Sequence, residues 1–322
     1  AEEMASRFGE RARAAFVDAT DPASLRKGLE GADAAVGCIG PFYKFALPMA
    51  RAALEAGVNY VDICDDYSPV EGILALDETA RQKGITIITG LGWTPGITNV
   101  LARHASRQFD EVDEIHIAWT GSASDSKGLA VIMHVFYAST GKVPTWLDGR
   151  LAEVKASTGW ETVEFPPPLG KVRVAHCGHP EPLTIPRYIK ARTVTIKGAL
   201  IPDWNNRVVE ILSSLGLINT PARMERMARL IHSIEGIFRV GGVACSGAKV
   251  TVKGRRDGQT KTVSYAVADR MGRLTGIPAS IGAQWLARGL IPQKGAFAPE
   301  GCIEPEPFLE ELAKRGIKVV EM

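Results

Sequence analysis

The chain has few cysteines and no long apolar segment, and both shortages limit what kind of protein it can be. Its 322 residues include five cysteines, none at a paired spacing, which fits a reducing compartment, the cytoplasm, better than a disulfide framework. The longest apolar helical run, Gly128–Ala138, is shorter than the roughly 20 residues that cross a bilayer. Because Ala1–Phe8 is polar and charged, no signal peptide is expected, and no membrane partner is predicted.

The chain also lacks a strong charge of either sign and the residue patterns of several common sites. A net charge of only +2 gives no electrostatic reason to expect a nucleic-acid partner. No G-x-S-x-G turn is present, which argues against an α/β-hydrolase. His176, Cys177 and His179 stand close together, but no second group of His or Cys follows at a suitable spacing. Since zinc needs three or four ligands, we expect no metal site.

A third absence concerns glycine at the start of the chain. A dinucleotide-binding sheet usually opens with a strand, a glycine-rich turn and a helix, and the first residues contain no such pattern. The nearest match, Gly90–Gly96, could be a pyrophosphate loop. However, Trp93 and Pro95 crowd it, and Pro95 lacks the N–H that a phosphate would bind. We expect instead that the first strand, its turn and helix, and the second strand lie upstream of Ala1.

Short apolar strands alternate with amphipathic helices through the first third of the chain. The expected strands are residues 12–18, 34–39, 60–63 and 85–89, with helices at 47–56 and 74–83 between them. This alternation predicts an α/β fold with a doubly wound (Rossmann-like) parallel sheet, N-terminally incomplete. From Glu114 onward, strands and a hairpin at 248–253 and 261–266 predict a second α+β domain built on a mixed sheet.

The expected domain limits follow from this change of pattern. Residues 1–95 are predicted to form the nucleotide-binding domain, and residues 96–285 a substrate and dimerisation domain. Residues 286–322 are predicted to return to the first domain. Met224–Ile237 carries apolar residues at helical spacing, including methionines, which is typical of a core or a dimer interface. We therefore expect a homodimer.

The segment Ile85–Val100 joins the last strand of the first region to a helix. Thr94 is a suitable N-cap, and Pro95 suits the first helical position. Such a turn exposes backbone N–H donors and the Trp93 ring at the carboxyl edge of the sheet, where open α/β folds bind ligands. The sequence therefore predicts that Trp93 and Thr94 bind the substrate.

Four segments carry a resemblance to a known family. They are GADAAVGCIGPF (Gly31–Phe42), ALEAGVNYVDICDD (Ala53–Asp66), GLGWTPGITN (Gly90–Asn99) and EPEPFLEELAKRGI (Glu304–Ile317). In this order they resemble the saccharopine dehydrogenase-like family of oxidoreductases. The resemblance implies a nucleotide-binding sheet, an inserted α/β domain and a returning C-terminal segment. It also implies hydride transfer with NADP or NAD, often on an imine derived from an amino acid.

The residues after the strand at 34–39 are candidates for binding the cofactor. Gly40 lets a ligand approach the backbone and Pro41 stiffens the loop, so the loop Cys38, Ile39, Gly40, Pro41 and Phe42 is predicted to run along the nicotinamide-side ribose. A plain strand-to-helix turn is the alternative. Asp18 ends its expected strand and could meet the adenine side of a dinucleotide; a simple cap of the following turn fits equally well.

Acidic and basic side chains near the predicted edge of the sheet are candidates for catalysis. Asp62, Asp65 and Asp66 lie on or just after the strand at 60–63, and mutual repulsion could raise one pKa into the range that suits acid–base catalysis. They could equally bind a cationic substrate, or Asp65 or Asp66 could cap the next helix. We assign Asp62 to the cofactor and Asp66 to catalysis. His134 is the second catalytic candidate because histidine titrates near neutral pH, with a core histidine as the alternative. Arg187 suits a substrate carboxylate.

These observations predict an NAD(P)-dependent oxidoreductase that acts on a small-molecule substrate with a C–N or carbonyl group. The alternative is a non-catalytic Rossmann-like binding or assembly protein, which the missing glycine turn would favour. The sequence does not distinguish NAD from NADP, because the strand end that reads the ribose is not visible.

Overall fold

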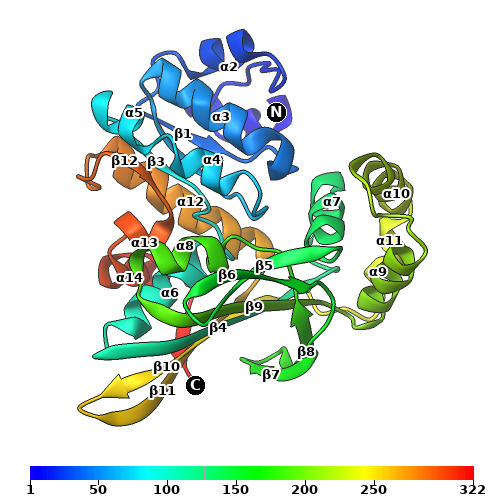
Figure 1. The fold of residues 1–322 in the computed structure, drawn as a ribbon. Helices are drawn as coiled ribbons and strands as arrows, with labels where there is room; N and C mark the ends of the chain where they lie inside the picture. The colour runs from blue at the N-terminus through cyan, green and yellow to red at the C-terminus, as the bar shows by residue number, and fades with distance from the viewer. Residues whose placement is uncertain (127) are drawn as a thin grey trace.

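The chain is organised around two β-sheets, one above the other in Figure 1. The computed structural model describes residues 1–126 and 128–322. The upper half holds the first sheet and the lower half the second, and a group of helices stands to one side of the lower half (Figure 1). In the described part of the chain, every helix is too short or too polar to span a bilayer.

The first sheet is parallel and has helices on both faces, as the alternating pattern predicted. Its strands lie in the order β1 (Ala34–Gly37), β2 (Asn59–Asp62), β3 (Thr86–Ile88) and β12 (Gly295–Phe297). Because side chains alternate along a strand, Tyr60 and Ile87 join the core under α3 (Phe42–Ala56). Their neighbours Val61 and Ile88 join the core around α12 (Met271–Ala287) on the opposite face.

The second sheet is mixed, which confirms the predicted α+β character of the later part of the chain. Its strand order is β13-β11-β10-β4-β9-β5-β6, with β8 beside β9 and β7 beside β8. Of the pairs described, only β4 and β9 run parallel. The strands are β4 (Glu111–Ser122), β5 (Lys142–Leu147), β6 (Arg150–Lys155), β7 (Glu161–Phe165), β8 (Gly170–His176), β9 (Ala191–Ile201), β10 (Ser246–Arg256), β11 (Gln259–Asp269) and β13 (Val319–Glu321).

Helices that join or flank the two sheets complete the fold. The lobe at the side consists of α7 (Leu129–Ala138), α9 (Trp204–Ser214), α10 (Pro221–Ser233) and α11 (Glu235–Phe238), with α10 packed on α7. The other helices are α1 (Glu2–Ser6), a 3-10 turn at Gly9–Arg11, α2 (Pro22–Leu29), α4 (Val70–Leu74), α5 (Asp77–Gln82), α6 (Ile97–Ser106), α8 (Glu181–Tyr188), α13 (Pro299–Cys302) and α14 (Pro305–Lys314).

The C-terminal segment is divided between the two sheets. β12 extends the parallel sheet beside β3, whereas β13 pairs with β11 of the mixed sheet. Helix α14 packs on α6, where Arg103 and Arg107 form ion pairs of 2.7 and 2.6 Å with Glu304. The domain limits at 95 and 285 stay a prediction. Most of α12 precedes residue 286 and so falls in the predicted second domain, yet this helix packs on β1 and β2 of the first sheet.

Three local predictions were wrong. Residues 12–18 form no strand: the segment pairs with no described strand, and Phe16 is 91% exposed. The helix expected at 74–83 is present as α5 and ends close to the predicted end, but its start is wrong, because α4 ends at Leu74 and α5 begins only at Asp77. Thr94 is not the N-cap of α6. The helix begins at Ile97 and its N-cap is Gly96, whose N–H donates to Asn99 Oδ1 (2.8 Å).

Candidate active site

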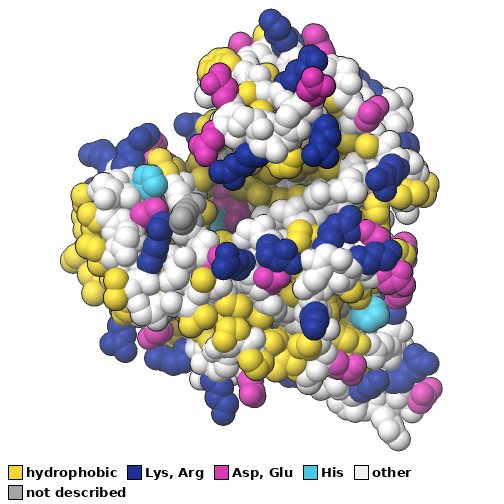
Figure 2. Space-filling view, turned by 180° about the vertical axis from the view of Figure 1, so that it is seen from behind, with side chains coloured by type: hydrophobic (Ala, Val, Ile, Leu, Met, Phe, Trp, Pro, Cys, Tyr) yellow, Lys and Arg dark blue, Asp and Glu magenta, His cyan; other side chains and the backbone are white. Residues whose placement is uncertain are grey.

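A cavity of about 230 Å³ lies at the carboxyl ends of β1, β2 and β3, facing the second sheet and α7. Figure 2 shows a hollow between the two halves of the molecule, with acidic side chains and a histidine at its floor. Eight of the predicted site residues line this cavity: Cys38, Gly40, Pro41, Phe42, Asp66, Trp93, Thr94 and His134. The structure thus brings together residues from four separate segments.

The loop after β1 forms the first wall of the cavity. Gly40 faces helix α7 so closely that an added Cβ would lie 3.0 Å from the Cβ of Ala130. Helix α3 begins at Phe42, and the N–H of Tyr43 donates to Asp66 Oδ2 (2.8 Å). This carboxylate therefore satisfies a free donor of the first turn and lies at the positive end of the helix.

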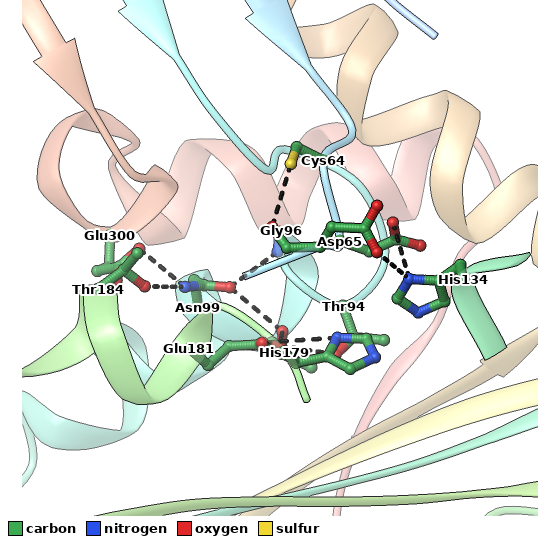
Figure 3. A network of polar contacts seen from close by, with 12 residues as sticks. Cys64, Asp65, Thr94, Gly96, Asn99, His134, His179, Glu181, Thr184 and Glu300 are labelled. Atoms are coloured by element: carbon green, nitrogen blue, oxygen red, sulfur yellow. Dashed lines mark hydrogen bonds and ion pairs between the residues drawn. The ribbon is translucent and has the colours of Figure 1, made fainter. Parts of the chain in front are cut away.

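Two carboxylates and an imidazole form the polar centre of the cavity. His134 Nδ1, from α7, lies 2.8 Å from Asp66 Oδ1 and 3.3 Å from Asp65 Oδ1. Asp66 is fully buried, whereas the Asp65 side chain keeps about a third of its exposure. His134 thus joins α7, next to the second sheet, to the carboxyl end of β2 (Figure 3).

The carboxylates determine the charge of His134. Burial alone would lower the pKa of His134, but Asp65 and Asp66 outweigh burial and raise this pKa to about 9. For Asp65, burial raises the pKa although His134 opposes the change. At neutral pH the imidazole is therefore protonated, and it carries a proton that can be donated to a ligand in the cavity.

Aromatic rings and a second histidine form the opposite wall. Trp93 and Trp119 meet edge to face with their ring centroids 6.1 Å apart. His179 lies 5.3 Å from Trp119 and 5.1 Å from His134 between ring centroids. Burial, helped by the charge of His134, lowers the pKa of His179 well below its ordinary value. Both ring nitrogens of this neutral histidine are buried without a hydrogen bond among the described residues, and Nδ1 lies 3.7 Å from Glu181 Oε2.

A buried polar network supports the cavity from behind (Figure 3). Glu181 Oε1 accepts hydrogen bonds from the hydroxyls of Thr94 (2.6 Å) and Thr98 (3.0 Å). Asn99 Nδ2 donates to Glu300 Oε2 (2.9 Å). Glu181 belongs to α8 and Glu300 to α13, so the network fixes the loop after β3 to two other elements.

Glu300 is expected to make stability depend on pH. Burial raises its pKa from 4.5 to about 7, so its contribution to stability is full below pH 4.5 and is lost as pH rises toward 7. The free energy of unfolding should fall by roughly 3 kcal/mol across this range. Urea unfolding at pH 4.5 and at pH 7 should show a smaller fall of the free energy of unfolding in Glu300→Gln than in the original protein. Glu71→Gln, on the exposed face of α4, is the control, and an equal fall in all three proteins would contradict the assignment.

Four predicted residues lie outside the cavity lining. Asp18 is half-buried and accepts hydrogen bonds from the N–H and hydroxyl of Thr20 (2.8 and 2.7 Å), and Ile39 is 41% exposed. Asp62 is fully buried, and its Oδ1 accepts from the N–H groups of Cys64 and Gly90, which ties β2 to the end of β3. Arg187 is exposed near the end of α8. Their functional roles stay predictions.

Among the cavity residues that were not predicted site residues, three carry titratable or aromatic side chains: Asp65, Trp119 and His179. Asp65 stood beside Asp66 in the acidic cluster and was passed over for it. Trp119 lies on β4, where its ring covers Gly198 so closely that an added Cβ there would be 2.0 Å from the indole. His179 was considered only as a metal ligand, in the group with His176 and Cys177, and was rejected as one. The sequence did contain a hint of a site: His179 lies between the end of a strand and a helix that begins with Glu181. Only the fold, however, brings His179 next to His134.

The cavity suits the nicotinamide part of a dinucleotide. The loop Cys38–Phe42 lies at a strand end where open α/β sheets bind ligands, and the buried Nε1 of Trp93 has no partner among the described residues. These residues would hold the nicotinamide side of the cofactor. Asp65, Asp66 and His134 also offer three ligand atoms within 4.8 Å of one another. The ion pair with His134 already accounts for this arrangement, and the absence of a metal stays a prediction.

The fold is that of an α/β protein with a parallel sheet and a second, mixed sheet, and its cavity lies at the carboxyl edge of the parallel sheet, where open α/β folds bind ligands. Residues 1–88 match the family model of the saccharopine dehydrogenase NADP binding domain. Residues 92–317 match the saccharopine dehydrogenase C-terminal domain. The chain belongs to the saccharopine dehydrogenase family.

Similar proteins agree with this assignment. The chain is 24% identical to a carboxynorspermidine synthase of Vibrio alginolyticus, over 84% of this chain and 73% of the relative. It is also 24% identical to a carboxyaminopropylagmatine dehydrogenase of a Synechocystis species, over 98% of this chain and 87% of the relative. Saccharopine dehydrogenase (L-Glu forming) of Saccharomyces cerevisiae shares the fold, with a TM-score of 0.68, 16% identity and coverage of 100% and 92%.

The family establishes the general activity. The chain is an NADP-dependent oxidoreductase of the saccharopine dehydrogenase type, with its cofactor-binding domain in residues 1–88. The expected hydride transfer is thereby confirmed as the type of reaction, and NADP as the cofactor. The alternative of a non-catalytic binding protein finds no support in these comparisons.

Proposed function

We propose that this oxidoreductase acts on a C–N bond of a substrate that carries a positively charged amine. The observation that carries the proposal is the pair of carboxylates, Asp65 and Asp66, in the cavity beside His134. No lysine or arginine of the described residues lines this cavity. A cationic group would therefore find opposite charge there, whereas a substrate carboxylate would find none of the forked partners it prefers.

Each side chain of the polar centre has a distinct proposed role. His134 donates a proton to the nitrogen of the reacting C–N group, because its Nδ1 is held by the carboxylates and its pKa is raised to about 9. Asp66 orients the imidazole, and Asp65 binds the substrate amine. Trp93 and Trp119 cover the reacting group and exclude water. When bound, the NADP cofactor supplies or accepts the hydride.

The names of two relatives support an amine substrate. One is called a carboxynorspermidine synthase and the other a carboxyaminopropylagmatine dehydrogenase, and both names describe compounds with amine nitrogens. At 24% identity these names indicate a class of substrate and not a particular compound. The cavity supports the same class independently, through its carboxylates.

The proposal is tested by reductive amination with the full chain. We expect NADPH to be oxidised, as followed by its absorbance, when an aldehyde and a primary amine are supplied together. Either partner alone should give at least tenfold slower oxidation. The reverse reaction, NADP reduction by a secondary amine, should occur at higher pH. Oxidation at the same rate with a carbonyl compound alone would contradict the proposal and indicate a carbonyl reductase.

We also propose that the enzyme is a homodimer of the cytoplasm. All five cysteines are free, and four of them are buried, which suits a reducing compartment. Exposed apolar side chains lie on α9 (Ile211), just after its end (Leu215) and on α10 (Leu230). Such a surface is more apolar than a monomer needs, and a second copy of the chain could cover it.

A further inference from the structure

A second cavity lies on the other side of α7, between this helix and the rest of the helical lobe. It holds about 80 Å³, and its wall is largely apolar. Ile132 and Phe136 line it from α7, Val208 and Val209 from α9, and Phe238 from α11. An apolar cavity next to a polar active site raises the question of which part of a ligand it receives.

The two cavities are neighbours. Ser126, Val131, Val135 and Leu200 line both of them, so these four residues form the boundary between the spaces. Val131 and Val135 lie one turn apart on α7, and His134 lies between them in the sequence. A ligand that contacts His134 is therefore separated from the second cavity by three aliphatic side chains and one serine.

A buried amide marks the far side of the second cavity. Asn205 is 3% exposed and its Nδ2 donates to the carbonyl oxygen of Phe238 (3.1 Å). Its Oδ1 is buried without a partner among the described residues, although a buried acceptor is costly to leave unpaired. The nearby carboxylate of Glu235 is already paired with Arg239. The acceptor thus suits a neutral donor and not a second charge.

We propose that the second cavity is a substrate subsite that binds a short linear alkyl arm ending in a neutral hydrogen-bond donor, a hydroxyl or an amide N–H. The inference rests on the proposed function, because the amine end of the same molecule lies with Asp65 in the first cavity. The volume is about half that of a 150 Å³ cavity that binds benzene. It therefore has room for an arm of about three or four carbon atoms beyond the boundary residues.

The subsite is tested with linear aliphatic amines as probes. Binding of ethylamine, butylamine, hexylamine and 6-aminohexanol to the full chain is followed by tryptophan fluorescence, since Trp93 and Trp119 line the first cavity. Affinity should rise about threefold to fourfold per added methylene once the arm enters the second cavity. The amino alcohol should bind about fivefold more tightly than hexylamine, because its hydroxyl can donate to Asn205 Oδ1.

Two variants of α9 separate the subsite from a general effect on the lobe. Val208→Phe fills the second cavity and should remove the gain with chain length while ethylamine binds as before. Arg207→Phe places the same ring at an exposed position of this helix that lines neither cavity, and it should leave the series unchanged. Ethylamine binding without any gain for longer amines would overturn the subsite alone. Failure of every amine to bind would overturn both the subsite and the proposed amine substrate.

Discussion

Replacing His134 by glutamine is expected to lower kcat by a factor of about 10² to 10⁴, the usual contribution of a general acid. Its Nδ1 contacts Asp66 and Asp65 at 2.8 and 3.3 Å, so the other nitrogen, Nε2, is the one that can give a proton to the substrate. Glutamine keeps a donor of similar reach but cannot carry a transferable proton near neutral pH. The measurement is kcat for the reductive direction with saturating NADPH.

The pH profile separates proton donation from a structural role of His134. Because Asp65 and Asp66 raise the pKa of His134 to about 9 despite burial, the reductive rate should be constant below that pH and fall above it. The fall of the reductive rate at high pH should be absent in His134→Gln. His116→Gln is the matched control, because His116 also pairs with a carboxylate (Glu114, 2.8 Å) but does not line the cavity. A full-rate His134→Gln enzyme would contradict the assignment.

Gly96→Ala is expected to lower the free energy of unfolding by roughly 4 kcal/mol, among the largest effects of a single substitution. Gly96 has φ 128°, a conformation that L side chains rarely adopt, and an added Cβ would lie 2.1 Å from the carbonyl oxygen of Gly92. Since the contact is with backbone, no side chain can move to relieve it. The loop that carries Trp93 and Thr94 would have to change shape, so both urea stability and NADPH binding should be affected.

Gly276→Ala serves as the matched control for this substitution. Gly276 lies inside α12, and an added Cβ there meets nothing within 4 Å. Alanine is favoured over glycine in a helix interior by about 0.5–1 kcal/mol, so this variant should be slightly more stable than the original protein. If the two variants unfolded at the same urea concentration, the fold would not depend on the positive φ of Gly96, and the prediction would be wrong.

The parallel sheet could be predicted because its strands are short apolar runs between helices. The strands at 34–39, 60–63 and 85–89 were found within a few residues of β1, β2 and β3. Residues 12–18 have a similar apolar pattern but pair with no strand among the described residues. A strand needs a partner as well as a pattern, and a local pattern does not identify partners.

The candidate site was predicted where its residues follow strands of the first sheet. Asp66, Trp93 and the loop Cys38–Phe42 all belong to this group, because the carboxyl edge of a parallel sheet gathers loops that are separate in the sequence. His179 and Glu181 come from the second half of the chain. Nothing local in the sequence relates Glu181 to Thr94, which lies 87 residues earlier, until the hydrogen bond between them is seen.

The position of β12 determines when the first sheet can be completed during synthesis. β3 ends at Ile88, but its partner β12 begins only at Gly295. At about 5–20 residues per second, a ribosome needs on the order of ten seconds or more to make the intervening chain. Throughout that time the growing polypeptide carries an unpaired strand edge, which can pair with other chains. Nascent chains that stop before residue 295 should therefore depend on chaperones to stay unaggregated.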